Sequence, residues 1–196
     1  MERLVLFAKR PRAGRVKTRL VPPLTGEQAL RLYTAFVEDQ LRFLESMVTP
    51  GLLVELAADG PWGPDDPPTT LSIVEQGSGD LGGRMHRAFA RSHAGGTERT
   101  VIVGADSPTL PASLVEAALG RLSAGASAVV SPAEDGGYVL IGMGRPVPEL
   151  FTGVPWGGPE VMAVTRERAH RAAVDLAEID GWYDVDDAGG LLRLRR

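Results

Sequence analysis

The chain has 196 residues, of which 21 are lysine or arginine and 25 are aspartate or glutamate, and it contains no cysteine. Domains cluster near roughly 100–200 residues, so we expect a single domain spanning residues 1–196. The absence of cysteine excludes disulfides, thiolate metal sites and thiol nucleophiles, and it makes a cytoplasmic protein the expected class. A net charge of −4 lacks the basic excess of a dedicated nucleic-acid binder, and no apolar run approaches the ~18 residues of a membrane span. We therefore expect neither a nucleic-acid nor a membrane partner, and a homodimer is compatible with the sequence.

Short apolar runs alternate with helical patterns along the chain. The predicted strands are residues 4–8, 52–57, 71–74, 100–104, 126–131 and 138–141, and the predicted helices are 27–47, 81–94, 111–122 and 159–173. Nearly continuous apolar character predicts strands that are buried on both faces. The alternation predicts a three-layer α/β/α, Rossmann-like domain with a mainly parallel sheet.

Several boundaries carry recognisable signals. Thr25 is expected to cap the helix that starts at Glu27, and Pro111 and Pro159 stand where proline favours the first turn of a helix. Residues 59–70 are rich in proline, glycine and acidic side chains, which predicts a surface loop.

The loop after the first predicted strand is strongly basic. Six cations lie within residues 9–19, and the chain's two lysines, Lys9 and Lys17, are both among them. Ligands of open parallel sheets bind beyond the carboxyl ends of the strands, so this loop is expected to bind nucleotide phosphates. The alternative is a solvated basic surface. Under the phosphate hypothesis the nucleotide-binding residues here are Ala8, Lys9, Gly14, Arg15 and Lys17, and the cations assigned a catalytic role are Lys9, Lys17 and Arg19.

A glycine-rich loop follows the strand predicted at 71–74. Gln76 and the backbone of Gly79 and Gly82 are expected to contact the base or ribose of a nucleotide, together with Asp80. Asp80 also stands where it can cap the next helix, and capping alone is enough to explain it.

Asp106 follows the central strand predicted at 100–104. A carboxylate at the end of a buried strand needs a partner, either a cation or the start of the next helix. Thr109 is better positioned than Asp106 to cap that helix. We therefore expect Asp106 to be catalytic and to bind Mg²⁺, or Mn²⁺ in its place, together with phosphate oxygens.

Two later acidic loops complete the candidate site. Glu134, Asp135, Gly136 and Gly137 are expected to contact the acceptor, although Asp-Gly before an apolar run equally predicts a plain hairpin turn. Trp156 either stacks on the acceptor or fills the core.

The last acidic loop contains Asp184, Asp186 and Asp187. Asp184 and Asp186 alternate along an extended segment, so one of the two is expected to face Asp106 as a second metal ligand. Asp187 is the expected cap of a closing helix.

The chain resembles the glycosyltransferase-A-like family of bacterial radical-SAM/selenodomain-associated transferases. This family is related to phospholactate guanylyltransferase and to the molybdenum-cofactor nucleotidyltransferases. The resemblance covers nearly the whole length and rests on motifs that occur in the family's order: FAKRPRAGRVKTRLVPPLTGEQALRLYTAF, GDLGGRM, GADSPTLP, EDGGYVLIG, VPWGGPEVM and DVDDAGGLLRL.

The resemblance implies a nucleotide-diphospho-sugar transferase fold, a nucleotide held over the first loop, and Mg²⁺ bound by the aspartate of GADSPTLP and by the DVD segment. The chain departs from the family at residues 187–190, where related enzymes carry Thr-Pro-Glu-Asp-Leu. It also has a single acid in Asp106-Ser107-Pro108, where sugar transferases of this fold usually show Asp-x-Asp.

These features favour nucleotidyl transfer from a nucleoside triphosphate to a small phosphorylated or sugar-like acceptor. In this reaction an acceptor phosphate is expected to attack the α-phosphorus, and pyrophosphate leaves. The alternatives are glycosyl transfer from a nucleotide-sugar and a catalytically inactive nucleotide-binding module.

Overall fold

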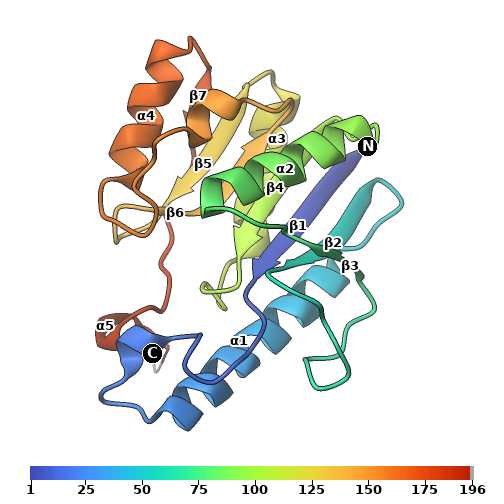
Figure 1. Ribbon diagram of the computed structural model, residues 1–196. Coiled ribbons are helices and arrows are strands. Elements are labelled where there is room, and N and C mark those ends of the chain that lie inside the picture. The colour runs from blue at the N-terminus through green and yellow to red at the C-terminus, as the bar shows by residue number, and fades with distance from the viewer. Residues whose placement is uncertain (195–196) are drawn as a thin grey trace.

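The structure is a computed structural model that describes residues 1–194, and it is built around a seven-stranded sheet (Figure 1). The strands are β1 (Glu2–Ala8), β2 (Leu52–Ala58), β3 (Ser72–Glu75), β4 (Arg99–Gly104), β5 (Ala128–Pro132), β6 (Tyr138–Met143) and β7 (Leu176–Glu178). Their order across the sheet is β3-β2-β1-β4-β6-β5-β7. β6 is antiparallel to both β4 and β5, and the other neighbouring pairs are parallel. The predicted mainly parallel sheet is therefore confirmed.

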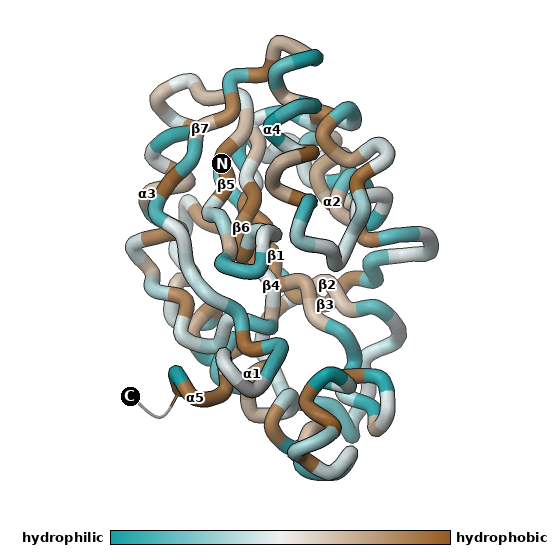
Figure 2. The backbone as a smooth tube through the Cα atoms, turned by 90° about the vertical axis from the view of Figure 1, so that its left-hand side faces the viewer, coloured by the Kyte–Doolittle hydropathy of each residue, from teal (hydrophilic) through white to brown (hydrophobic). Residues whose placement is uncertain are grey.

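Helices cover both faces of the sheet. They are α1 (Gly26–Ser46), α2 (Leu81–Ala94), α3 (Ala112–Ser123), α4 (Val161–Arg171) and α5 (Ala188–Arg193), with short 3₁₀ turns η1 (Thr18–Leu20) and η2 (Pro148–Phe151). Side chains of α1 and α3 share one buried apolar cluster, and side chains of α2 and α4 share the other. The apolar central strands lie between these layers (Figure 2), which confirms the three-layer α/β/α arrangement. Among residues 1–194, no helix is both long and apolar enough to cross a lipid bilayer.

Helix starts follow the expected chemistry in three places. The Thr25 side chain accepts a hydrogen bond from the backbone N–H of Gln28, and the Gln28 side chain accepts one from the Thr25 N–H, which forms a capping box. Asp80 caps α2 and Asp187 caps α5 through their carboxylates. Each cap satisfies a backbone donor that the first turn of a helix leaves without an intrahelical partner.

Other boundary predictions were wrong. Pro111 is the N-cap residue of α3 and Pro159 precedes α4, so neither proline lies within the first turn. Thr109 does not cap α3, because its hydroxyl is hydrogen-bonded to the Tyr183 hydroxyl at 2.8 Å. β3 is an edge strand whose side chains are exposed except for the half-buried Val74, although its apolar residues predicted burial on both faces. β7 was not predicted, because its three residues include two that are half-buried and one that is exposed, which gives no buried apolar run.

The turn between β5 and β6 is the hairpin that the Asp-Gly pair favours. Gly136 has a φ of 90° and its backbone lies against the start of α4, so a Cβ added there would be 2.0 Å from the Pro159 carbonyl oxygen. The Gly136 carbonyl accepts a hydrogen bond from the Met162 N–H at 2.8 Å. The glycine is therefore required by the close approach of these two backbone segments.

Replacing Gly136 by alanine is expected to lower the free energy of unfolding by about 3 kcal/mol, because left-handed strain and a backbone clash add together. Gly125 is the matched control, since its φ is 108° and a Cβ there would meet nothing within 4 Å. Gly125→Ala is expected to cost about 1 kcal/mol. Urea unfolding of both variants measures the difference, and equal losses would contradict the assigned contact.

Candidate active site

The candidate site lies at the carboxyl ends of β1 and β4, which are neighbours in the sheet. The basic loop follows β1 and Asp106 follows β4. The backbone N–H of Val185 donates to the Asp106 carbonyl at 2.9 Å, which ties the segment carrying Asp184 and Asp186 to the same edge. Three segments that are distant in the sequence therefore converge on one point, and Figure 1 shows the C-terminal segment beside the chain that leads into α1.

The Lys17 ammonium is the centre of this convergence. Its Nζ contacts the Oδ1 atom of Asp106 and lies 2.7 Å from Oδ1 of Asp186. The Lys17 side chain is 2% exposed, whereas those of Asp106 and Asp186 are 41% and 38% exposed. The ammonium also lies 5.8 Å and 5.5 Å from the ring centroids of Tyr33 and Phe36 on α1. Lys17 is thus a buried cation beneath two accessible carboxylates.

Burial and charge act in opposite directions on this lysine. Burial lowers the pKa of Lys17, but the carboxylates of Asp106 and Asp186 raise it by more, so its net pKa lies above the ordinary value. Lys17 therefore stays protonated throughout the physiological range. Its backbone is left-handed, with φ 48° and ψ 37°, a conformation that costs a non-glycine residue roughly 1–2 kcal/mol. Strain of this kind is frequent at functional positions.

Several acidic side chains lie around the single positive charge of Lys17. Burial, followed by the charges of Asp135, Asp186 and Asp106, raises the pKa of Asp184 to about 6 against the opposing effect of Lys17. Both Asp184 and Asp186 line the same cavity as Asp106, so the prediction that only one of them would face it was wrong. Side chains two positions apart in an extended segment point to the same side, so both carboxylates face the cavity while Val185 between them is buried.

These carboxylates have the chemistry of a site for a hard divalent cation. Within residues 1–194, no three acidic or histidine side chains are arranged as a ready-made metal cage. Mg²⁺ usually takes one or two carboxylates and completes its shell with water and substrate phosphates. The excess negative charge that raises the pKa of Asp184 fits a site of that kind.

A cavity of about 460 Å³ opens over this edge of the sheet. Its charged lining residues are Lys9, Arg84, Asp106, Asp184 and Asp186. Its apolar wall comes from strand ends and from the first turns of α2, and includes Phe7, Leu81, Met85, Ile102, Ile141 and the rings of Tyr138 and Trp156. Ala8, Gln76, Gly79 and Gly157 also line it. A largely apolar cavity with a few convergent charges is the usual form of a small-molecule site.

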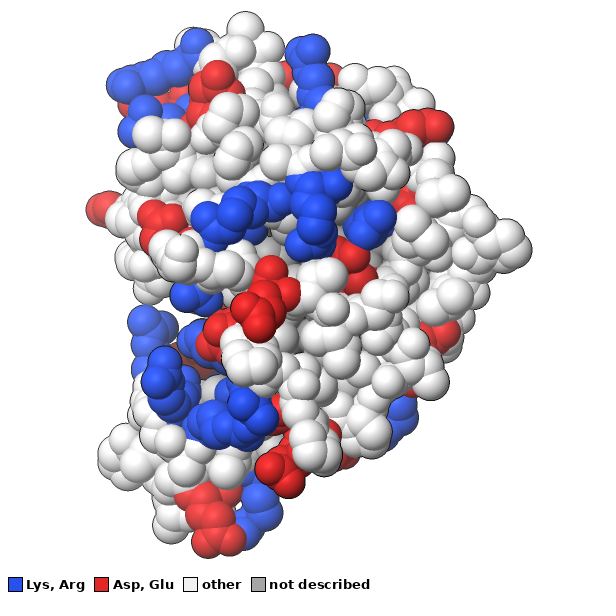
Figure 3. Space-filling view, turned by 45° about the vertical axis from the view of Figure 1, so that its right-hand side comes forward, with Lys and Arg blue, Asp and Glu red and all other residues white. Residues whose placement is uncertain are grey.

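A smaller cavity of about 230 Å³ lies beside it and is lined mainly by the basic loop. Lys9, Arg15, Lys17 and Arg19 all border it, together with Asp135 and Asp186. The structure therefore brings together the four cations that the sequence assigned to phosphate. On the face shown in Figure 3, acidic side chains lie between a basic patch across the middle and another at the lower left.

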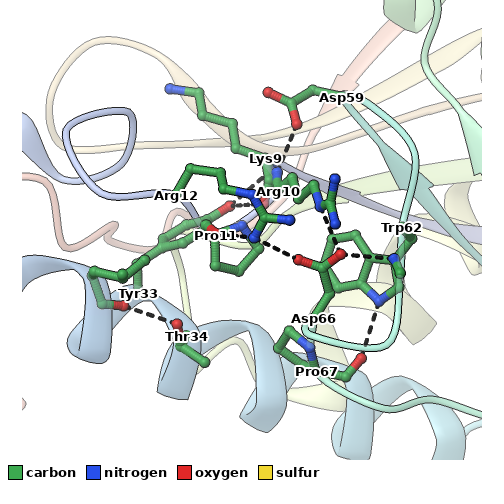
Figure 4. A network of polar contacts seen from close by, with 12 residues as sticks. Lys9, Arg10, Pro11, Arg12, Tyr33, Thr34, Asp59, Trp62, Asp66 and Pro67 are labelled. Atoms are coloured by element: carbon green, nitrogen blue, oxygen red, sulfur yellow. Dashed lines mark hydrogen bonds and ion pairs between the residues drawn. The ribbon is translucent and has the colours of Figure 1, made fainter.

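Two other cations of the loop have a structural partner. The Asp66 side chain is fully buried and accepts from Arg10 Nε at 2.6 Å and from Arg12 Nη1 at 3.0 Å. It also accepts from the Gly63 N–H at 2.7 Å. Figure 4 shows Arg10 and Arg12 turned toward Asp66, whereas the Lys9 side chain points away from it. The predicted surface loop thus supplies a buried acid that anchors the basic loop.

Replacing Asp66 by asparagine is expected to lower the free energy of unfolding by about 2 kcal/mol at pH 7, because hydrogen bonds to charged groups are lost. The Arg and Gly63 N–H contacts outweigh burial and depress the pKa of Asp66. Its stabilising contribution is therefore present above the unfolded pKa of ~3.9 and is lost as the pH falls through the lower folded pKa.

Urea unfolding at pH 7 and pH 3 tests this dependence, and the difference between wild type and Asp66→Asn is expected to shrink at pH 3. Asp65→Asn is the matched control, because Asp65 is an exposed neighbour in the same loop. A loss for Asp66→Asn that stays constant down to pH 2 would contradict the ionic role.

The loop after β3 is held by arginines of α2. Both amide hydrogens of Gln76 are used, since its Nε2 donates to the carbonyls of Ala8 and Ala57. Arg84 donates to the Gly79 carbonyl at 3.0 Å and to the Gln76 side-chain oxygen at 3.3 Å. Sequence reasoning missed Arg84, although it lies in the GDLGGRM motif one turn into α2, at a position that faces this loop. Gln76 and Arg84 together form the wall of the cavity on the β3 side.

Some predicted contact residues lie outside the lining of the central cavity. Gly14 and Asp80 are outside it, and the Asp80 carboxylate is used as a helix cap. Gly136 and Gly137 belong to the hairpin turn. Glu134 pairs with Arg193 at 2.6 Å. Glu134 and Asp135 instead line a separate polar cavity of about 430 Å³.

Trp156 borders the central cavity and also belongs to the packing behind it. Its ring lies 6.4 Å from that of Phe151, and it packs directly on Gly82, where an added Cβ would be 2.6 Å from the indole. Trp156 therefore fills part of the core, and it also borders the cavity where an acceptor could contact it. Gly82 itself lies behind the indole and contributes close packing to the site.

The comparison with solved structures confirms the fold class. A proposed nucleotide-diphospho-sugar transferase from Desulfovibrio desulfuricans G20 is 33% identical, with a TM-score of 0.86 over 100% of this chain and 86% of that chain. A CMP:2-keto-3-deoxy-manno-octonic acid synthetase complexed with CTP is 11% identical, with a TM-score of 0.58 over 100% of this chain and 97% of that one. Glucosyl-3-phosphoglycerate synthase from Mycobacterium tuberculosis, in complex with Mn²⁺ and UDP-glucose, is 13% identical, with a TM-score of 0.60 over 94% of this chain and 70% of that one.

The fold is thus shared with nucleotide-diphospho-sugar transferases and with enzymes that transfer nucleotidyl groups. No curated protein matches the chain. Residues 46–158 match a family described as uncharacterized proteins conserved in bacteria, DUF2064. This match covers more than half of the chain, and it includes the loop after β3, Asp106 and Trp156. The chain therefore belongs to the DUF2064 family of bacterial proteins.

Proposed function

We propose that the protein is a nucleotide-using transferase that depends on a divalent cation and moves a nucleotidyl group from a nucleoside triphosphate to a small acceptor. The observation that carries the proposal is the buried Lys17 ammonium in contact with both Asp106 and Asp186 beside a cavity. The order of the KTRL and GADSPTLP motifs further supports kinship with the radical-SAM/selenodomain-associated transferases.

The basic side chains would act on the phosphates. Lys9, Arg15, Lys17 and Arg19 border one small cavity, from which they would bind and orient a triphosphate and stabilise charge that develops on its oxygens. Ala8, Gln76 and Gly79 would form the wall beside the nucleoside. Asp106, with Asp184 or Asp186, would hold Mg²⁺ or Mn²⁺, which when bound supplies charge neutralisation to the phosphates.

The transfer balances without a covalent enzyme intermediate. An acceptor oxygen forms a bond to the α-phosphorus, and the bond from that phosphorus to the oxygen of the β-phosphate breaks. Pyrophosphate leaves with the electron pair, and a proton on the acceptor oxygen is released to solvent. The chain's contribution is positioning and electrostatics, in agreement with the absence of cysteine from the sequence.

Glycosyl transfer from a nucleotide-sugar is the second candidate. It is favoured by the 33% identity to a proposed nucleotide-diphospho-sugar transferase. The segment Asp106-Ser107-Pro108 favours nucleotidyl transfer instead, because it has one acid where sugar transferases of this fold usually show Asp-x-Asp.

Thermal shift separates the two reactions, because a ligand that binds the folded state raises the melting temperature. The protein is heated with each nucleoside triphosphate and with each common nucleotide-sugar, in Mg²⁺, in Mn²⁺ and in chelator. Nucleotidyl transfer predicts the larger metal-dependent shift with a triphosphate, and glycosyl transfer predicts it with a nucleotide-sugar. If no nucleoside triphosphate and no nucleotide-sugar raises the melting temperature, both candidate reactions are contradicted. Tight binding of a nucleotide without turnover would identify an inactive binding module.

A further inference from the structure

The end of the central cavity beside β3 has a lining of its own. It is bordered there by Gln76 and Gly79 of the loop after β3, and by Leu81, Arg84 and Met85 of α2. The basic loop follows β1 and the lining carboxylates lie at the loop after β4, and β2 separates β1 from β3 in the sheet. A nucleotide whose phosphates lie at the basic loop would therefore place its base at the β3 end, beside the apolar side chains of α2.

The hydrogen-bond acceptors at the β3 end are already in use. Arg84 Nε donates to the Gly79 carbonyl at 3.0 Å, and Arg84 Nη1 donates to the Gln76 side-chain oxygen at 3.3 Å. Arg87, one turn further along α2, donates to the backbone carbonyls of Gln76 and Ser78. The Gln76 amide donates both of its hydrogens to carbonyls at the ends of β1 and β2. Gln76 therefore keeps no amide hydrogen for a ligand, and its oxygen holds Arg84.

The Arg84 guanidinium is the side-chain donor that remains at this end. Its Nε and Nη1 contacts fix the plane of the group, and its Nη2 donates to no protein atom among residues 1–194. A guanidinium carries five N–H donors and no acceptor, so a ligand group that bonds it must supply an acceptor. The four cations assigned to the phosphates border the smaller cavity, and Arg84 does not. Arg84 is therefore placed to bond an oxygen of the base.

We propose that Arg84 determines which base the protein accepts, and that it selects bases of the keto class. These bases carry a carbonyl oxygen at the ring position where adenine and cytosine carry an amino group. The carbonyl oxygen accepts from Arg84, whereas an amino group would set donor against donor and leave both without a partner. Arginine pairs in the same way with O6 and N7 of guanine in nucleic acids. This inference rests on the proposed function, since it takes the ligand of the cavity to be a nucleotide.

Two pairs of nucleotides isolate the chemistry that Arg84 would recognise. ITP and ATP share the purine ring and carry a carbonyl and an amino group, respectively, at position 6. UTP and CTP differ in the same way at position 4 of the pyrimidine ring. The dissociation constants of all four are measured by calorimetry in Mg²⁺. We expect the keto member of at least one pair to bind at least about tenfold more tightly than its amino partner, because hydrogen bonds to charged groups contribute about 10–100-fold in affinity.

Arg84→Met removes the guanidinium and keeps the length of the side chain. It is expected to reduce the preference for the keto member to less than about threefold, mainly by weakening that member. Arg87→Met is the matched control, because Arg87 holds the same loop through the carbonyls of Gln76 and Ser78 but does not line the central cavity. It is expected to retain the keto preference. Circular dichroism verifies that both variants are folded.

Equal binding within both pairs, or a preference for the amino members, would overturn the proposal. An equal loss for all four nucleotides in Arg84→Met would also overturn it, since a contact with the phosphates does not depend on the base. A loss of the preference in Arg87→Met as well would assign the selection to the order of the loop and not to Arg84. Nucleotides that bind without a keto preference contradict only the base assignment, whereas no binding of any of the four contradicts the proposed function.

Discussion

Replacing Lys17 by methionine is expected to lower kcat/KM for the nucleotide donor by about 10²–10³-fold, because preorganised charges of this kind contribute about 3–4 kcal/mol to transition-state stabilisation. Methionine keeps most of the length and the apolar stem, so the packing on Tyr33 and Phe36 is largely retained. The ammonium that contacts Asp106 and Asp186 is lost. Steady-state turnover with the donor identified by thermal shift measures the effect.

Arg31→Met is the matched control for this variant. Arg31 is an exposed cation on α1 that pairs with Glu27 at 2.5 Å, and it does not line the central cavity or the smaller basic one. Its loss is expected to change turnover by less than twofold, since exposed ion pairs contribute about 0–1 kcal/mol. Full turnover in Lys17→Met would contradict the assignment of the basic loop to the phosphates.

A second readout separates two roles of Lys17. If its main role is to bind phosphate, Lys17→Met weakens nucleotide binding measured by calorimetry without metal. If Lys17 only neutralises the carboxylates, nucleotide binding without metal stays unchanged. We expect weakening, because the side chain lies in the same small cavity as Lys9, Arg15 and Arg19.

The meeting of Lys17 and Asp106 was predictable because of the topology. Both residues follow parallel strands, and the carboxyl ends of parallel strands lie at the same edge of a sheet. β1 and β4 then pair directly, which brings their loops together. The same reasoning correctly grouped the cations of residues 9–19, since four of them border one cavity.

The contacts of the other two cations could not be read from the sequence. Arg10 and Arg12 pair with Asp66, a residue about 55 positions away in a loop without regular structure. Nothing in a proline- and glycine-rich stretch indicates which of its acids is buried. The exposure of β3 was not predicted for a related reason. Apolar residues show that a segment can form a strand, but they do not show that the strand lies at the edge of the sheet.

The prediction for Asp184 and Asp186 misapplied the period of an extended segment. Successive side chains point to opposite sides, so side chains two positions apart point to the same side. Asp184 and Asp186 accordingly both border the cavity, whereas Val185 between them is fully buried. That Tyr138 Oη and Trp156 Nε1 have no hydrogen-bond partner within residues 1–194 is invisible in the sequence, because it depends on the folded surroundings.

Replacing Asp106 by asparagine is expected to abolish the metal-dependent part of nucleotide binding, a loss of at least about 100-fold in affinity in the presence of Mg²⁺ or Mn²⁺. Asparagine preserves the shape of the side chain and removes the negative charge that a hard cation requires. It also removes one of the two carboxylates on Lys17, so the lysine keeps only its contact with Asp186. Isothermal titration with nucleotide, in metal and in chelator, measures the two parts separately.

Asp187→Asn is the matched control for the loss of one acid, because Asp187 caps α5 and asparagine caps a helix nearly as well. It is expected to leave metal-dependent affinity within about twofold. In chelator, Asp106→Asn is expected to bind nucleotide at least as tightly as wild type, since a carboxylate that repels the phosphates has been removed. Opposite signs in metal and in chelator are the signature of a metal ligand. An equal loss under both conditions would indicate instead that Asp106 acts only by holding Lys17 in place.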